Sequence, residues 1–96
     1  MRVIASESAR RYVSEHGGRI YVWPQAARCC RGTEFLRSGT EPRRGHEFRR
    51  VADDGLEVYF PADLRELPEE LHLELRRFAR RRVEAYWNGL AWWARD

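Results

Sequence analysis

The sequence predicts an α+β fold in which one N-terminal helix accompanies a small mixed β-sheet or β-sandwich. Three observations lead to this class. Residues early in the chain recur at helical spacing on one face: Ala9, Tyr12, Val13 and His16. Arg19 to Trp23 is rich in β-branched and aromatic residues, which favours a strand. Asp53-Asp54-Gly55 separates two further β-rich runs, as expected for a hairpin.

The N-terminal elements follow from local signals. Residues 1–4 are a short apolar start that predicts an edge strand. Ser6 is a suitable N-cap, and Glu7 complements the positive end of the helix dipole. The helix is expected over residues 7–16, because Gly17-Gly18 can supply the left-handed residues that end a helix.

The central elements alternate between strands and loops. The strand over 19–23 has Ile20 and Val22 on one face, and Pro24 is expected to end it. Residues 24–33 form a loop, 33–37 a short strand and 38–45 a second loop. Runs over 47–51 and 56–60 flank the Asp-Gly turn, and 61–67 is expected to be a turn or a single helical turn.

The last third of the sequence supports two interpretations. Pro68 followed by two glutamates resembles a helix start, and the apolar spacing slightly favours a helix over 68–88. However, Leu71, Leu73 and Leu75 alternate with polar residues, as in a strand, and Val83, Ala85 and Trp87 alternate likewise. The pattern alone leaves both interpretations open.

Composition limits the classes of protein that this chain can be. Its 96 residues suit one domain over 1–96, and 43% hydrophobic content with four Trp argues against disorder. No apolar run could cross a membrane or serve as a secretory signal at residues 1–7, so we expect a cytoplasmic protein without membrane contact. Clustered Trp87, Trp92 and Trp93 are expected to close the core or to form a partner surface.

The net charge of +3 does not by itself indicate a nucleic-acid partner. All 18 basic residues are Arg, and 15 acidic residues are interspersed with them. The densest basic run, Arg76 to Arg82, lies between Glu74 and Glu84. We therefore interpret the Arg as a solvated surface and do not expect nucleic-acid binding.

The adjacent pair Cys29-Cys30 is the main candidate for chemistry. It lies in a predicted loop, and Arg28 and Arg31 should lower the pKa of the thiols and raise the thiolate fraction. Gly32 permits a close approach of the backbone to a ligand. A disulfide between neighbouring residues is strained, so the pair suits thiol redox chemistry or soft-metal binding better than a structural role. The alternative is that one or both cysteines are small buried hydrophobic residues.

Two thiolates do not complete a tetrahedral metal site. The sequence offers three further soft ligands, His16, His46 and His72, but no spacing typical of a zinc site. His16 is expected to cap the helix, His46 to be solvated in a loop, and His72 to point outward if its segment is a strand. Two chains that each supply Cys29 and Cys30 would complete the ligand set.

Hydrolase, phosphate-loop and dinucleotide-binding motifs are missing, so we expect a binding protein more than an enzyme. The paired carboxylates Asp53 and Asp54 are explained by their turn.

The order of helix, Gly-Gly, aromatic strand, Cys loop and Asp-Gly hairpin resembles the HesB-like domain of A-type iron–sulfur carriers. It is more similar to the small proteins of the CC/Se motif family, in which Cys-Cys or a selenocysteine occupies this loop. The pieces that carry the resemblance are Ala9 to Val13, Gly17 to Val22, Cys29-Cys30, Gly55 to Pro61 and Phe78 to Leu90. This resemblance implies two strands over 71–76 and 82–87. The Cys-x-Cys of A-type carriers is missing from the tail, where Gly89 to Trp93 stands instead.

Three functions follow from these residues. The first is an iron–sulfur cluster or soft metal ion bound through Cys29 and Cys30, with a homodimer sharing the site and Arg28 and Arg31 giving electrostatic support. The second is a thiol redox module in which one cysteine attacks and its neighbour resolves. The third is a non-catalytic domain that uses its Arg and Trp surface to bind an unidentified protein partner.

Overall fold

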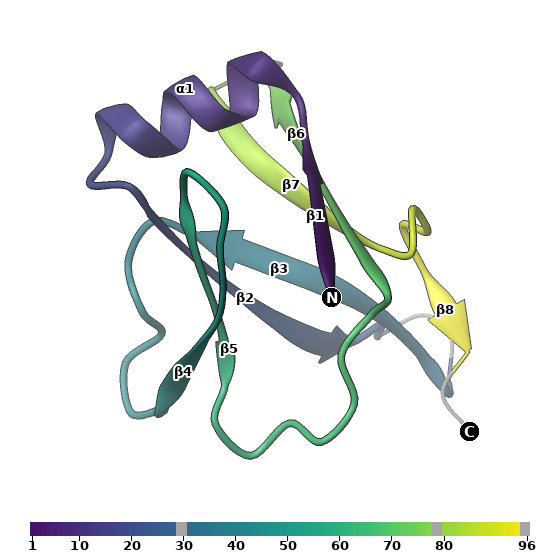
Figure 1. The fold of residues 1–96 in the computed structure, drawn as a ribbon. Coiled ribbons are helices and arrows are strands. Elements are labelled where there is room, and N and C mark those ends of the chain that lie inside the picture. The colour runs from purple at the N-terminus through teal and green to yellow at the C-terminus, as the bar shows by residue number, and fades with distance from the viewer. Residues whose placement is uncertain (29–30, 78–79, 95–96) are drawn as a thin grey trace.

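One helix and eight strands make up the part of the chain that this computed structural model describes, residues 1–28, 31–77 and 80–94. Their order along the chain is β1 (Arg2–Ala5), α1 (Glu7–Glu15), β2 (Arg19–Ala26), β3 (Thr33–Gly39), β4 (Phe48–Asp53), β5 (Glu57–Pro61), β6 (Glu70–Arg76), β7 (Arg82–Trp87) and β8 (Trp93–Ala94). Figure 1 shows α1 across one end of the strands. The predicted α+β class is confirmed.

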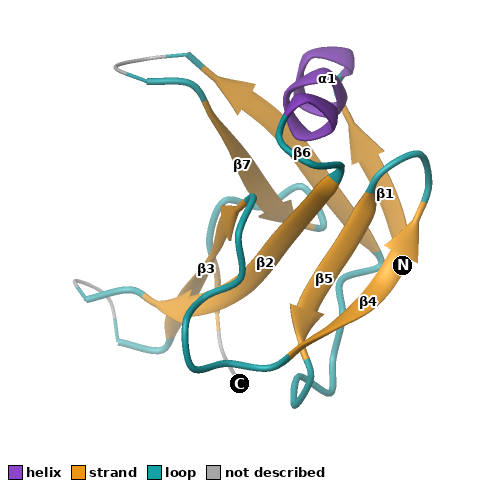
Figure 2. Cartoon of the chain, turned by 90° about the vertical axis from the view of Figure 1, so that its left-hand side faces the viewer, coloured by secondary structure: helices purple, strands orange, loops and turns teal. Residues whose placement is uncertain are grey.

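The strands form two mixed sheets. The smaller sheet has the order β1-β6-β7, with β1 parallel to β6 and β7 antiparallel to it. The larger sheet has the order β4-β5-β2-β3-β8, in which only β2 and β5 are parallel. Figure 2 shows α1 at the end of the larger sheet where β2 begins. The predicted edge strand at the N-terminus is confirmed as β1.

The core lies between α1 and the inner faces of both sheets. The helix contributes residues four positions apart, and the strands contribute alternate residues, as expected when one face of each element is buried. The side chains that are most deeply buried are Val13 from α1, Ile20 and Val22 from β2, Val58 and Phe60 from β5, and Leu71 and Leu73 from β6. No helix in the described ranges is long and apolar enough to cross a membrane.

The helix begins as its sequence predicts. The hydroxyl of Ser6 accepts a hydrogen bond from the backbone N–H of Ala9 at 3.2 Å, which satisfies one of the free donors of the first turn. The last helical residue is Glu15, one residue earlier than predicted, and His16 is the C-cap. Gly17 and Gly18 follow with φ of 107° and 78°, a region that favours glycine.

The C-terminal third is two strands, so the alternative helix over 68–88 is wrong. Leu71 and Leu73 are fully buried, whereas His72 and Glu74 face outward. β6 lies between β1 and β7, and its apolar face packs into the core. Burial of this face between neighbouring strands outweighs the weak helix propensity of the segment. The segment 62–69 that precedes β6 contains a turn and no helical turn.

Pro24 does not end its strand, contrary to the prediction. β2 continues to Ala26, and the loop predicted over 24–33 is correspondingly shorter. The N–H of Ala27 donates to Thr33 across the hairpin, so the alternation of an antiparallel ladder turns the nitrogen of Pro24 away from β3. On that side β5 pairs only with residues 19–21. The missing N–H therefore costs no ladder hydrogen bond.

Two other strands differ from the prediction: β3 is longer than expected, and β8 is additional. β3 extends to Gly39, because Ser38 and Gly39 pair with Val22 and Tyr21, so they are not part of a loop. The short strand β8 was not expected, although Asn88-Gly89 is a hairpin signal. Both residues have positive φ, and Trp87 and Leu90 exchange backbone hydrogen bonds of 3.0 and 2.8 Å across them. This turn directs the chain back toward β3.

The Asp-Gly hairpin is confirmed between β4 and β5, with Gly55 at φ 77°. The pairing shifts register between Arg50 and Ala52, so Val51 forms a bulge that bends the edge strand β4.

Candidate functional site

The predicted cysteine site lies in the connection between β2 and β3. Ala26 pairs with Glu34, and the N–H of Ala27 donates to the carbonyl of Thr33 at 2.9 Å, which closes the base of the loop. Cys29 and Cys30 themselves lie outside the described residues. The geometry therefore defines the two ends of the loop, and the solvent exposure of the thiols stays a prediction.

The residues that flank the pair are at the surface. Arg28 and Arg31 are both exposed, and so is Gly32. Gly32 has a φ of 79°, and a Cβ there would meet no described atom within 4 Å. Its observed role is thus to let the backbone turn toward β3, since a left-handed residue is needed there.

Two of the three histidines already have partners within the fold. Nδ1–H of His16 donates to the carbonyl oxygen of Tyr12 at 2.7 Å, and the two rings stack with centroids 4.0 Å apart. This confirms the capping role, because a free carbonyl of the last turn gains a donor. Nε2–H of His72 donates to Glu70 at 3.1 Å, and His46 is exposed. Among residues 1–28, 31–77 and 80–94, no three His, Cys, Asp or Glu gather as a metal site would require.

The acidic pair and the basic run are explained by local contacts. Arg10 donates to the backbone carbonyl of Asp54 at 2.6 Å, and Asp53 lies 3.7 Å from Arg50. At the end of the β6–β7 ladder, Arg76 and Arg82 both pair with Glu84, at 3.0 and 3.2 Å. These contacts support the interpretation of both features as parts of the surface.

Three carboxylates on the sheets accept hydrogen bonds from neighbouring side chains, which lower their pKa values. The hydrogen bond from the Tyr59 hydroxyl at 2.5 Å is the main cause that lowers the pKa of Glu57. Burial would raise the pKa of Glu84, but the hydrogen bond from Tyr86 and the charge of Arg76 together lower it. The pKa of Glu70 is lowered first by the hydrogen bond from His72 and then by Arg2.

The tryptophan cluster divides between the core and the surface. Trp87 and Trp93 pack against the core and stack on each other, with ring centroids 4.7 Å apart and 22° between the planes. Trp92 is 58% exposed and lines a separate depression beside β3 and β7. The expected core role is therefore confirmed for Trp87 and Trp93, whereas a partner surface at Trp92 stays a prediction.

A cleft of about 520 Å³ adjoins the base of the cysteine loop. Its aromatic lining consists of Trp23, Phe48, Trp87 and Trp93, and its charged lining of Glu34, Arg43, His46, Asp63 and Glu66. Sequence reasoning did not identify this cleft, because its walls come from segments far apart in the chain. The only local signal was the density of aromatic residues in β2 and in the C-terminal tail.

Comparisons with known proteins agree with one part of the sequence analysis. A model of the CC/Se motif containing family matches residues 1–83, which is most of the chain. No curated protein and no solved structure matches the chain.

Proposed function

Because the chain belongs to the CC/Se motif containing family, we propose that Cys29 and Cys30 are its functional residues and jointly bind a soft metal ion or an iron–sulfur cluster. The observation that carries this proposal is an adjacent thiol pair, flanked by exposed Arg28 and Arg31, in a loop whose ends are joined by the β2–β3 ladder. Thiolates are the ligands that such soft centres prefer. We also propose that the chain shares the fold of the HesB-like domain of A-type carriers, with its thiol pair where the first carrier cysteine would stand.

The donor set fits a centre shared between two chains. One chain offers two thiols, whereas a tetrahedral site takes four ligands. His16 and His72 are engaged with Tyr12 and Glu70, and the described residues contain no cluster of three potential ligands. A homodimer would supply four thiolates without any histidine.

The protein's own contribution is to keep the pair deprotonated and reachable. Positive charge next to a thiol stabilises the thiolate, which is the form that binds metal, so Arg28 and Arg31 should favour binding near neutral pH. The exposure of both arginines and of Gly32 leaves the surface around the loop open to a second chain. A bound cluster would supply electron transfer or iron and sulfide for delivery.

Anaerobic purification followed by absorption spectroscopy, metal analysis and sedimentation tests this function. We expect charge-transfer bands from a bound cluster or Cu(I), or stoichiometric zinc without visible bands, at one centre per two chains. Cys29→Ser and Cys30→Ser should each abolish both the centre and the dimer. His46→Gln replaces the exposed imidazole and is the matched control, which should retain both. A loaded monomer with one centre per chain would contradict the shared site.

The alternative function is thiol redox chemistry, which the pairing of Cys-Cys with selenium in the family's description favours. One thiolate of the pair would attack a substrate disulfide, forming a mixed disulfide and releasing the first substrate thiolate. The neighbouring thiolate would then attack the mixed disulfide, forming the Cys29–Cys30 disulfide and releasing the second. The pair loses two electrons and the substrate disulfide gains them.

The same preparation separates the two functions. A redox module would lack bound metal, reduce a model disulfide in a single turnover and lose two hydrogen atoms from its mass. Reduction of the model disulfide by the Cys29→Ser,Cys30→Ser protein would exclude the pair as its source. We place this protein in the cytoplasm within this proposal, because reducing conditions keep such a pair available.

A further inference from the structure

The cleft beside the cysteine loop has an aromatic interior. Trp23 and Phe48 meet edge to face, with centroids 6.2 Å apart and 69° between their planes. Trp87 and Trp93 stack at 4.7 Å and contribute another part of the wall. A flat ligand could stack on these rings through apolar contacts. A positive charge on the ligand would be attracted by the negative face of the ring π-systems.

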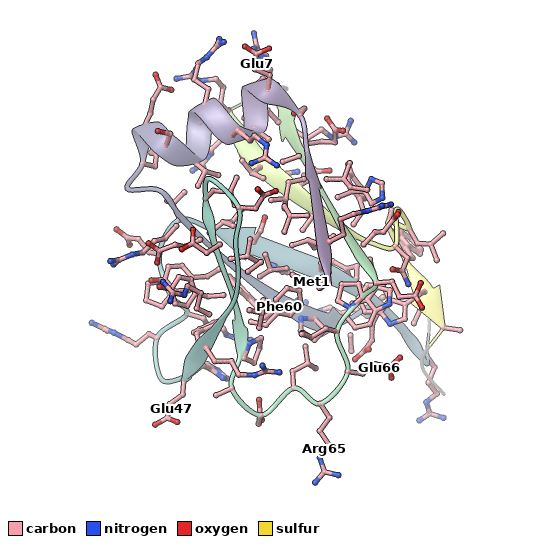
Figure 3. All side chains as sticks on the ribbon, in the orientation of Figure 1. Met1, Glu7, Glu47, Phe60, Arg65 and Glu66 are labelled. Carbon is pink, nitrogen blue, oxygen red and sulfur yellow. The ribbon has the colours of Figure 1, made fainter. Side chains whose placement is uncertain are left out.

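The rim of the cleft is acidic, although the whole chain carries a net charge of +3. Among the described residues, Asp63 and Glu66 supply its exposed carboxylates and Glu34 a further one, together with the guanidinium of Arg43 and the imidazole of His46. Asp63 and Glu66 lie on the segment that joins β5 to β6, and both are exposed. Figure 3 shows Glu66 on this segment, at the end of the molecule opposite Glu7 of α1.

We propose that this cleft is a binding site for a small organic cation with a flat apolar body, such as an aromatic amidine or amine. The tryptophan and phenylalanine rings would contact the apolar body, and the ring quadrupoles together with the rim carboxylates would attract the positive charge. A volume of about 520 Å³ is within the range of small-molecule sites. An anionic ligand would be repelled by the exposed carboxylates of Asp63 and Glu66, so we expect the cleft to prefer a positively charged ligand.

The cleft reaches the base of the cysteine loop through two backbone pairings. Glu34 in its wall pairs with Ala26 at the end of β2, and Ala94 pairs with Thr33 at the start of β3. A cation bound here would lie next to the connection that carries the thiols. The proposal rests on the described residues of the cleft alone and stands whether or not the thiols bind metal.

Three probes of the same shape test the sign of the ligand: benzamidine, benzamide and benzoate. Three of the four tryptophans line the cleft, so binding should change the intrinsic fluorescence in a saturable way. We expect benzamidine to bind about tenfold more tightly than neutral benzamide, in line with a partly desolvated cation–π contact. Benzoate should not bind. Equal affinity for the three probes, tighter binding of benzoate, or no saturable change with benzamidine would overturn the proposal.

Charge variants at exposed positions provide a second test. Because these side chains are not part of the core, the substitutions should change the affinity for benzamidine without unfolding the protein. Asp63→Asn and Glu66→Gln should each weaken benzamidine binding about two- to fivefold, as expected for one partly screened charge. Arg43→Gln should strengthen it by a similar factor, which a loss of structure would not do. Glu15→Gln, at the end of α1, is the matched control and should leave the affinity unchanged. If Arg43→Gln weakens binding, or Glu15→Gln acts like Glu66→Gln, the assignment to this cleft is wrong.

Discussion

The hydroxyl of Ser38 in β3 lies 2.5 Å from the backbone carbonyl oxygen of Val83 in β7 and donates a hydrogen bond to it. These strands belong to different sheets, so this bond joins β7, at the edge of the smaller sheet, to the part of β3 that β8 leaves unpaired. Val83 is buried as a residue, and the hydroxyl of Ser38 provides its carbonyl oxygen with a donor from the other sheet. The contact explains why a polar residue occupies this place in β3.

Ser38→Ala should therefore destabilise the protein by about 1 kcal/mol, which is the usual contribution of one intramolecular hydrogen bond. Denaturant unfolding followed by tryptophan fluorescence measures this change. Ser14→Ala, at an exposed position of α1, is the matched control and should change the unfolding free energy by less than about 0.5 kcal/mol. An effect of Ser38→Ala no larger than that of the control would show that the bond between the sheets contributes nothing.

Pro24 lies in the part of β2 that β5 does not pair with, which leads to a prediction about self-association. Pro24→Thr restores an N–H on the side where β5 no longer pairs, and exposed strand edges with free N–H groups promote pairing between chains. We expect increased self-association at high protein concentration in sedimentation and light scattering. Gln25→Thr, whose N–H is turned toward β3, should remain as soluble as the native protein. If both variants self-associate to the same extent, the restored N–H at position 24 is not the cause.

Glu70 should make the stability of the protein depend on acid. Its pKa is lowered from 4.5 in the folded state, first by the hydrogen bond from His72 and then by Arg2. The stability contributed by the charged carboxylate is therefore present above pH 4.5 and lost as the pH falls through the lowered folded pKa. Glu70→Gln should be less stable than the native protein near neutral pH, and this difference should shrink as the pH falls.

Urea unfolding across this range of pH measures the effect of Glu70. Glu69→Gln, an exposed neighbour, is the matched control and should follow the native protein closely at every pH. If the unfolding free energies of Glu70→Gln and the native protein differ by the same amount from neutral to acid pH, the charge of Glu70 does not contribute to stability.

Both cysteines are predicted to be accessible in the folded monomer. A bulky thiol reagent should label Cys29 and Cys30 without denaturant, and Arg28→Gln,Arg31→Gln should slow the reaction near neutral pH, since fewer charges stabilise the thiolate. Arg80→Gln,Arg81→Gln removes the same charge from the connection between β6 and β7 and should leave the rate unchanged. If neither cysteine reacts before unfolding, the pair is part of the core.

The arginine run at the end of the β6–β7 ladder is predicted not to bind nucleic acid. Arg76 and Arg82 are paired with Glu84, and the guanidinium of Arg81 lies 5.8 Å from the centre of the Tyr12 ring. Duplex and single-stranded oligonucleotides should show no saturable binding at moderate salt. Micromolar binding that is lost on replacing Arg80, Arg81 and Arg82 together would prove this prediction wrong.

The sequence by itself determined the elements whose signals are local. The side chain of Ser6 and the glycines after His16 delimit α1 through contacts within one or two turns of the chain. Gly55 sets the β4–β5 hairpin through its own backbone conformation. The cysteine pair was also visible in the sequence, because adjacency and flanking charge are properties of the chain itself, and the family match over 1–83 agrees with it.

Only the tertiary structure decided the features that depend on neighbours distant in sequence. Leu71 and Leu73 lie in a strand because β1 and β7 flank that segment and the core covers its apolar face, whereas the local pattern allowed a helix. Pro24 fits inside β2 because β5 has already separated from that edge. The acidic, aromatic cleft exists because β2, β4, the 62–69 connection, β7 and β8 converge there. The helix and strand propensities of such a segment differ by less free energy than is gained by burying its apolar side chains. Packing against distant segments therefore decides which structure forms.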